Sequence, residues 1–135
     1  MAGVSGPRYQ QLPLWRDSQH LLLEVEQAVR GFTRYHKYSL GVELRQQAMT
    51  VCRLVARAAQ QNSPQQRLEL LERLVWEVED FKIRLQLGKE LQVFASFAQF
   101  QRLAELAVVL GKQCGGWCKK ARSVALQSCQ GTCKA

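Results

Sequence analysis

Apolar residues recur every three or four positions along most of the chain, a spacing that places them on one face of an α-helix. Segments with this pattern run from about residue 12 to 30, from 39 to the boundary at 62, from 64 to 87 and from 96 to 122. None of them shows the alternation of a strand. Four helices with short connections predict an all-α, up-down-up-down antiparallel four-helix bundle.

The third segment carries more apolar surface than a single bundle requires. Its first stripe consists of Leu68, Leu71, Val75, Val78, Phe81 and Leu85, and a second consists of Leu70, Leu74, Ile83 and Leu87. An exposed apolar face of that length would be a liability in a monomer. The surplus therefore predicts a subunit interface and a homo-oligomer.

Serine and proline predict where the helices begin. Pro13 fits a first helical turn, because its missing N–H has no partner there in any case. Ser39 and Ser96 are expected to cap the second and fourth helices. The run Ser63-Pro64-Gln65-Gln66 predicts a capping box, with the serine and Gln66 satisfying each other's backbone N–H groups.

Glycine predicts where helices end, and composition sets the domain limits. Gly31 is expected to end the first helix in the left-handed conformation, and Gly88 to end the third. The 135 residues are enough for one domain. We expect a disordered leader over residues 1–11, the bundle over 12–122, and a flexible, cysteine-containing tail over 123–135.

The net charge of +8 indicates that the predicted bundle has a polyanionic partner. Two segments each carry five cations against one acid: Arg34, Lys37, Arg45, Arg53 and Arg57 against Glu43, and Arg102, Lys112, Lys119, Lys120 and Arg122 against Glu105. The other two helices are nearly neutral. This pattern predicts a cationic side that binds nucleic acid, although a solvated surface that favours solubility remains an alternative.

The connection from Phe32 to Tyr38 mixes aromatic and basic residues. Such a mixture can stack on and neutralise nucleic acid. The alternative is that Phe32 and Tyr38 clamp a helix–helix turn against the core.

No stretch is apolar over the roughly 18 residues that a membrane span requires, and no secretory signal is visible at the start of the sequence. We therefore expect a soluble, cytoplasmic protein with no membrane partner.

Residues for catalysis are scarce. His20 and His36 have no partner at the spacing of a known motif. The acids at 77, 79 and 80 fit a solvated helix face, and the glycines at 111, 115 and 116 follow a helix rather than the strand of a dinucleotide site. We expect no enzyme and no cofactor.

Five cysteines leave alternatives open. Cys52 lies beside an apolar stripe and suits a buried site. Cys114 and Cys118 are four residues apart, as are Cys129 and Cys133, so the four could hold zinc or form disulfides, although packing is the simpler interpretation in a reducing compartment. Gly111 and Gly115 would permit close helix approach, and Trp117 would plug the end of the bundle.

Four short runs together resemble a known family. They are Leu-Pro-Leu-Trp at 12–15, Tyr-Ser-Leu-Gly-Val-Glu-Leu-Arg at 38–45, Phe-Lys-Ile-Arg-Leu at 81–85, and Gly-Lys-Gln-Cys-Gly-Gly-Trp-Cys-Lys at 111–119. The chain resembles, over about residues 12 to 122, the accessory variability determinants (Avd) of diversity-generating retroelements. The two cysteines within the last run and the Cys129/Cys133 tail depart from the family pattern.

The resemblance implies a homopentameric barrel of four-helix bundles without catalytic activity. It would bind the retroelement's reverse transcriptase and template RNA, with DNA as a further ligand, and support mutagenic cDNA synthesis. The positions carried over are Arg84 and Gly115-Gly116-Trp117. The full set of expected contacts to nucleic acid or polymerase is Arg34, Lys37, Arg45, Arg53, Arg57, Arg84, Lys112, Lys119, Lys120 and Arg122. The alternative is an oligomeric basic scaffold that docks an acidic protein without binding nucleic acid.

Overall fold

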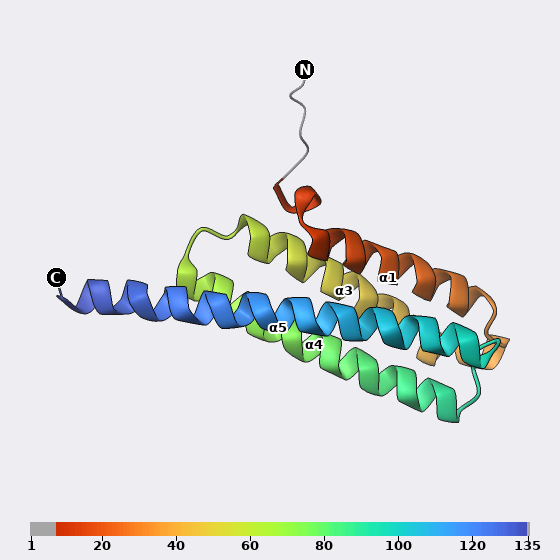
Figure 1. The fold of residues 1–135 in the computed structure, drawn as a ribbon. Coiled ribbons are helices and arrows are strands. Elements are labelled where there is room, and N and C mark those ends of the chain that lie inside the picture. The colour runs from red at the N-terminus through yellow and green to blue at the C-terminus, as the bar shows by residue number, and fades with distance from the viewer. Residues whose placement is uncertain (1–7, 135) are drawn as a thin grey trace, which may run out of the picture.

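The computed structural model describes residues 8–134, with side chains as far as Cys129, and these residues form only helices and turns (Figure 1). The elements are the 3₁₀ turn η1 (Arg8–Gln11) and the α-helices α1 (Pro13–Arg30), α2 (Arg34–Lys37), α3 (Leu40–Gln60), α4 (Pro64–Glu90) and α5 (Phe97–Lys134). The all-α prediction is confirmed. Most of the expected leader, residues 1–7, lies outside the described part.

The four long helices form a bundle in which each lies beside two others. Helix α3 packs between α1 and α4, and α5 packs between α4 and α1. Helices α3 and α5 therefore occupy diagonal corners (Figure 1). The side chains of the expected stripes fill the centre, and Leu21, Leu44, Phe81 and Leu103 are each no more than 1% exposed.

The second of the two apolar stripes expected on α4 is only partly exposed in the structure. Leu74 is fully buried in the common core and Leu70 is half-buried against it. Ile83 and Leu87 are 57% and 54% exposed, and Trp76, seven residues before Ile83, is 62% exposed. The apolar face that remains uncovered on α4 is therefore Trp76, Ile83 and Leu87, here called the outer α4 stripe.

The prediction that Gly88 ends helix α4 is wrong. The helix continues to Glu90 and ends in a Schellman arrangement, in which Val93 N–H donates to Gly88 O at 3.1 Å and Gln92 N–H donates to Lys89 O at 3.0 Å. Gln92 takes the left-handed position with φ 57°. Gly88 is instead a packing residue, because an added Cβ would lie 3.0 Å from the Phe94 ring.

The turn between α3 and α4 is closed by side chains at both helix ends. Ser63 Oγ accepts from Gln66 N–H at 3.3 Å, which confirms the predicted cap. The reciprocal half of the capping box is absent among the described contacts, because Ser63 N–H donates to Gln61 Oε1 at 3.1 Å. Arg67 caps the end of α3 by donating to Ala58 O at 3.0 Å and Gln61 O at 2.6 Å.

Three other expected helix ends have mixed outcomes. Ser96 Oγ accepts from Gln99 N–H at 3.1 Å, as expected of a cap. Ser39 stands at the cap position of α3, but its hydroxyl donates to Tyr35 O at 2.9 Å. Gly31 does end α1, but with φ −88° rather than the expected left-handed conformation.

Helix α5 is longer than expected and projects beyond the other helices (Figure 1). The end predicted near Arg122 is wrong. Ala121 and Ala125 are each 7% exposed, and Gln65 Nε2 donates to Ala125 O at 3.4 Å. Cys114, Cys118, Ala121 and Ala125 follow one another at spacings of four, three and four residues, so the apolar stripe of α5 continues alongside the first turn of α4.

Residues 8–11, expected to belong to a disordered leader, instead form η1. This turn packs on α1 and α3, and the Tyr9 ring lies edge-on to Trp15 at 4.7 Å.

Candidate nucleic-acid interface

The expected cationic side does not form as one surface. The basic residues of α3 and those of α5 lie on helices at diagonal corners of the bundle, so their exposed faces point in different directions. The short helix α2 contributes Arg34 and Lys37 at the end of the bundle where α3 begins.

Three of the ten expected cations are paired with acids. Arg45 binds Glu26 of α1, and Arg122 Nη2 lies 3.1 Å from Glu72 of α4. Arg84 is held by two carboxylates and is described below. Each of the three guanidinium groups forms an ion pair to a neighbouring helix, and Arg84 also pairs with Asp80 of its own helix.

The other seven cations have no ion pair within the described part of the chain. They are Arg34, Lys37, Arg53, Arg57, Lys112, Lys119 and Lys120. All but the half-buried Lys37 are exposed. Their charge is therefore available to an anionic partner.

Arg53 and Arg57 form the best-defined pair in this set. They are four residues apart on the outer face of α3, so like charges stand next to each other on the helix. Arg53 Nη2 donates to Thr50 Oγ1 at 3.1 Å, which holds one guanidinium in place. Arg53 also borders an open groove of about 560 Å³ between α1 and α3 whose lining includes Leu22, Met49 and Gln46.

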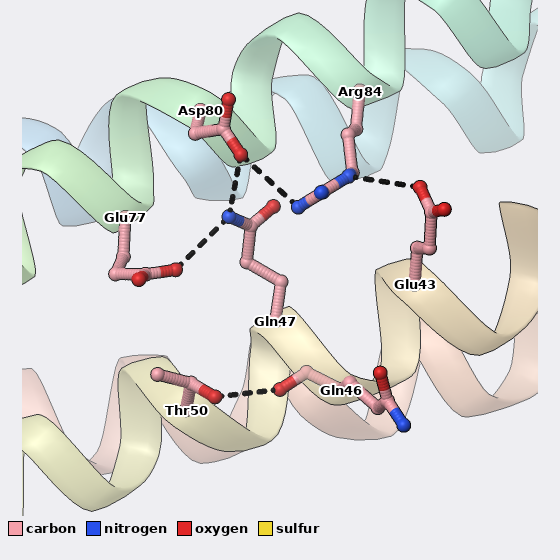
Figure 2. A network of polar contacts seen from close by, with 7 residues as sticks. All are labelled: Glu43, Gln46, Gln47, Thr50, Glu77, Asp80 and Arg84. Atoms are coloured by element: carbon pink, nitrogen blue, oxygen red, sulfur yellow. Dashed lines mark hydrogen bonds and ion pairs between the residues drawn. The ribbon is translucent and has the colours of Figure 1, made fainter.

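Arg84, one of the positions carried over from the family, belongs to a polar network between α3 and α4 (Figure 2). Its Nη1 lies 3.1 Å from Asp80 Oδ2, and its Nε lies 3.3 Å from Glu43 Oε1. The buried Gln47 amide donates to Asp80 at 2.9 Å and to Glu77 at 3.0 Å. In this arrangement Arg84 neutralises two acids and fixes the contact of α3 with α4.

Gln47 was not singled out from the sequence. It lies three residues after Leu44 and four before Val51, at the spacing of the core stripe, so its burial could have been inferred. Its Oε1 is buried and has no hydrogen-bond partner in the described part of the protein. The acids of α4 were expected on a solvated face, but Glu77 and Asp80 are half-buried against this amide.

The glycines before Trp117 do not bring helices together. An added Cβ at Gly111 would lie 2.9 Å from Lys82 Nζ, the flexible end of a side chain, and one at Gly115 or Gly116 would meet nothing within 4 Å. The expected close approach at Gly111 and Gly115 is therefore not seen within the described chain. Trp117 is half-buried against the core beside the α3–α4 turn, where it borders a pocket with Asn62 and Pro64.

Burial raises the pKa of all three core cysteines. It raises the pKa of Cys114 to about 12, with the neighbouring Cys118 as a second cause. Burial also raises the pKa of Cys118 and of Cys52, whose thiol donates to Ser18 O at 3.4 Å. Metal binding needs thiolates, and the described residues contain no group of three side chains placed to hold a metal. Cys129 is exposed, and the side chain of Cys133 lies outside the described residues.

The chain matches no model of a known protein family, and a search of curated proteins finds no match. Within the described residues, no helix combines the length and apolar character that crossing a membrane would need.

Proposed function

We propose that the chain is a non-catalytic accessory protein of the Avd kind. It binds the reverse transcriptase of a diversity-generating retroelement together with template RNA and cDNA, and so supports mutagenic cDNA synthesis. The observation that carries the nucleic-acid part is the Arg53–Arg57 pair, two exposed arginines that form no ion pair with any residue the structure describes, on a chain of charge +8.

The electrostatic reasoning is direct. Two like charges four residues apart destabilise an isolated helix by about 0.2–0.5 kcal/mol. A phosphate lying between Arg53 and Arg57 reverses the sign of that interaction. It also releases condensed counterions, so binding weakens as salt rises. Such contacts position a strand without reading its sequence.

The outer α4 stripe supports an oligomer, which the resemblance implies is a pentamer. Trp76, Ile83 and Leu87 lie on one exposed face at spacings of seven and four residues. A second copy that covers this face would remove the apolar surface from water. Light scattering should then give about five times the 15.4 kDa chain mass. Ile83→Glu with Leu87→Glu should reduce that mass, while Leu23→Glu, at an equally exposed leucine of α1, should not.

RNA binding is tested by fluorescence anisotropy across a salt series. Arg53→Gln with Arg57→Gln should weaken binding of a structured RNA roughly tenfold. It should also reduce the slope of log affinity against log salt by roughly 0.7–0.9 for each phosphate that is no longer neutralised. Arg16→Gln with Arg73→Gln removes the same charge from exposed positions on α1 and α4 and is the matched control. RNA affinity that does not respond to salt, or an equal reduction in both variants, would contradict the assignment of this face.

The polymerase part is tested by co-purification with the reverse transcriptase encoded beside this gene. We expect the two proteins to co-purify after nuclease treatment, and cDNA synthesis to require the chain. Capture of an acidic protein with no measurable RNA binding would instead favour the scaffold alternative. The absence of a neighbouring reverse-transcriptase gene would remove the proposed partner.

A further inference from the structure

One end of the bundle carries an exposed aromatic and basic surface that the proposed function does not use. It is formed by α2 and by the α4–α5 turn. Its exposed rings are Tyr35 at 81%, Tyr38 at 71% and Phe97 at 64%. We call this surface the turn end and define it by Arg34, Tyr35, Lys37, Tyr38, Lys89 and Phe97.

Buried rings join the two halves of the turn end. Phe32, just before α2, is 5% exposed and meets Phe94 of the α4–α5 turn edge-on at 5.6 Å. Phe94 lies 5.8 Å from Phe100, which lies 5.7 Å from Phe97. Phe32 therefore clamps the turn against the core, which was one of the two interpretations of the connection from Phe32 to Tyr38. Tyr38 is exposed and does not clamp it. The exposed Phe97 ring contacts the buried Phe100 ring, which a series of tilted and edge-on contacts connects to Phe94 and Phe32.

A pocket of about 310 Å³ opens beside Phe97. Its lining residues are Lys89, Gln92, Phe94, Ser96, Phe97 and Phe100. This volume is at the lower end of the range for small-ligand sites. The pocket combines aromatic faces with the Gln92 amide, a Ser96 hydroxyl that still has its own proton to donate, and the Lys89 ammonium, 5.4 Å from the Phe100 ring centre. A flat ring with a polar edge, such as a nucleobase, matches that combination.

The backbone at the rim of this pocket is strained. Gln92 has φ 57° at a position where glycine or asparagine is usual. Holding a residue of this type there costs about 1–2 kcal/mol. A glycine at position 92 would relieve this strain, but it would have no side chain to form hydrogen bonds. Gln92 instead places an amide group at the pocket rim.

Charge at the turn end favours an anionic ligand. Residues 30–39 contain three cations and no acid. Arg34, Lys37 and Lys89 have no ion pair among the residues that the structure describes. Exposed aromatic rings interleaved with unpaired cations are the combination that single-stranded nucleic acids require, because every unpaired base offers a face for stacking.

We propose that the turn end binds unpaired nucleotides of RNA or DNA. One base enters the pocket against Phe97, neighbouring bases stack on Tyr35 and Tyr38, and the phosphates lie against Arg34, Lys37 and Lys89. This inference rests on the proposed function, which supplies a nucleic acid as the ligand. It adds that the nucleic acid bound at the turn end is single-stranded. A duplex cannot use the site in this way, because its base faces are already stacked.

The test compares three labelled probes by anisotropy with the full chain: a 20-nucleotide uridine strand, the corresponding thymidine strand, and a blunt RNA duplex of the same length. Replacing Tyr35, Tyr38 and Phe97 together by alanine should weaken binding of both single strands roughly ten- to a hundredfold. Duplex binding should change less than twofold. Tyr35→Phe with Tyr38→Phe keeps the rings and should keep wild-type affinity. The uridine and thymidine strands distinguish RNA from DNA as the preferred source.

A second measurement avoids any variant. Strands that contain 4-thiouridine are irradiated with the wild-type protein, and the crosslinked peptides are identified by mass spectrometry. Crosslinks to peptides that contain Tyr35, Tyr38 or Phe97 support the proposal. Crosslinks confined to α3 or to the end of α5 overturn it.

The outcomes separate this inference from the proposed function. If the alanine variant binds single strands normally, or binds duplex and single strand equally weakly, the turn end is not a stacking site while the RNA-binding function stands. If the wild-type chain binds no probe, both fall. A protein captured from nuclease-treated extract through these aromatics, with no strand bound, also overturns the proposal.

Discussion

Glycine has opposite roles in two regions of the bundle. Near the turn end, Gly41 and Gly88 are buried, and an added Cβ would lie 2.9 Å from Val29 and 3.0 Å from Phe94. In the second half of α5, Gly115 and Gly116 have nothing within 4 Å of the same added atom. The first pair lets helices and turns approach each other, whereas the second pair leaves helical backbone uncovered.

The two regions also differ in how closely this chain packs around its own helical backbone. Beneath the exposed surface of the turn end, the Phe32–Phe94 contact and the Schellman hydrogen bonds of Gln92 and Val93 hold the helix ends together. Mid-helix glycines weaken a helix by roughly 0.5–1 kcal/mol each relative to alanine. At Gly115 and Gly116 no atom of the described residues lies close enough to make up for that cost through packing.

The largest expected effect is that of Gly41→Ala. The new methyl group would meet the rigid Val29 side chain and His36 O, at 2.9 and 3.2 Å. Overpacking of this kind costs about 2 kcal/mol, which urea unfolding at fixed protein concentration should show. Gly31→Ala is the control, since its Cβ would make only an ordinary 3.5 Å contact. Equal stability of the two variants would show that α1 can shift to admit the methyl group.

Removal of the Arg67 side chain should destabilise the opposite end by about 1.5 kcal/mol, because hydrogen bonds from a charged donor are stronger than neutral ones. Arg67→Ala leaves Ala58 O and Gln61 O without their donor at the end of α3. Arg67→Lys should retain part of the stability, and Arg73→Ala, at an exposed site on α4, is the matched control. Hydrogen exchange should localise the destabilisation to the last turn of α3; an effect spread evenly over the bundle would contradict the capping role.

The bundle and its core could be predicted because periodic apolar spacing is a local property of the sequence. The caps at Ser63 and Ser96 are local too, and both are confirmed. The end of α4 was misplaced because glycine can end a helix or admit a neighbour, and only the position of Phe94 decides that Gly88 admits one. Composition does not distinguish these cases.

The candidate site was harder to predict for the same physical reason. Ten cations were expected to contact nucleic acid or the polymerase, but how charges combine depends on which helices are adjacent. Helix order placed α3 and α5 at diagonal corners and brought Glu43 of α3 to Arg84, whereas Asp80 lies four residues before Arg84 on α4 itself (Figure 2). The half of the turn end from Arg34 to Tyr38 could be identified from the sequence, but Lys89 and Phe97 lie far along the chain and no local spacing connects them to it.

Relief of the Gln92 strain should stabilise the chain by about 1 kcal/mol, because glycine adopts positive φ without the Cβ penalty. Gln92→Gly is therefore expected to raise the urea midpoint. Gln101→Gly, an identical change at an exposed position inside α5, should lower it by a similar amount. If Gln92→Gly also destabilised the protein, the left-handed turn at the end of α4 would be wrong.

The smallest expected effect, Gly116→Ala, bears most directly on the opening comparison. Alanine adds helix propensity to an exposed position with free space around it, so the isolated chain should gain about 0.5 kcal/mol. Gly111→Ala is the internal control. Its methyl group displaces Lys82 from the 2.8 Å pair with Glu79 and should leave stability nearly unchanged. If the bare backbone of α5 is kept for a partner, Gly116→Ala will be more stable yet bind the reverse transcriptase, or a second copy of the chain, less tightly. A Gly116→Ala protein that is less stable when monomeric would show that another part of this chain already occupies that face.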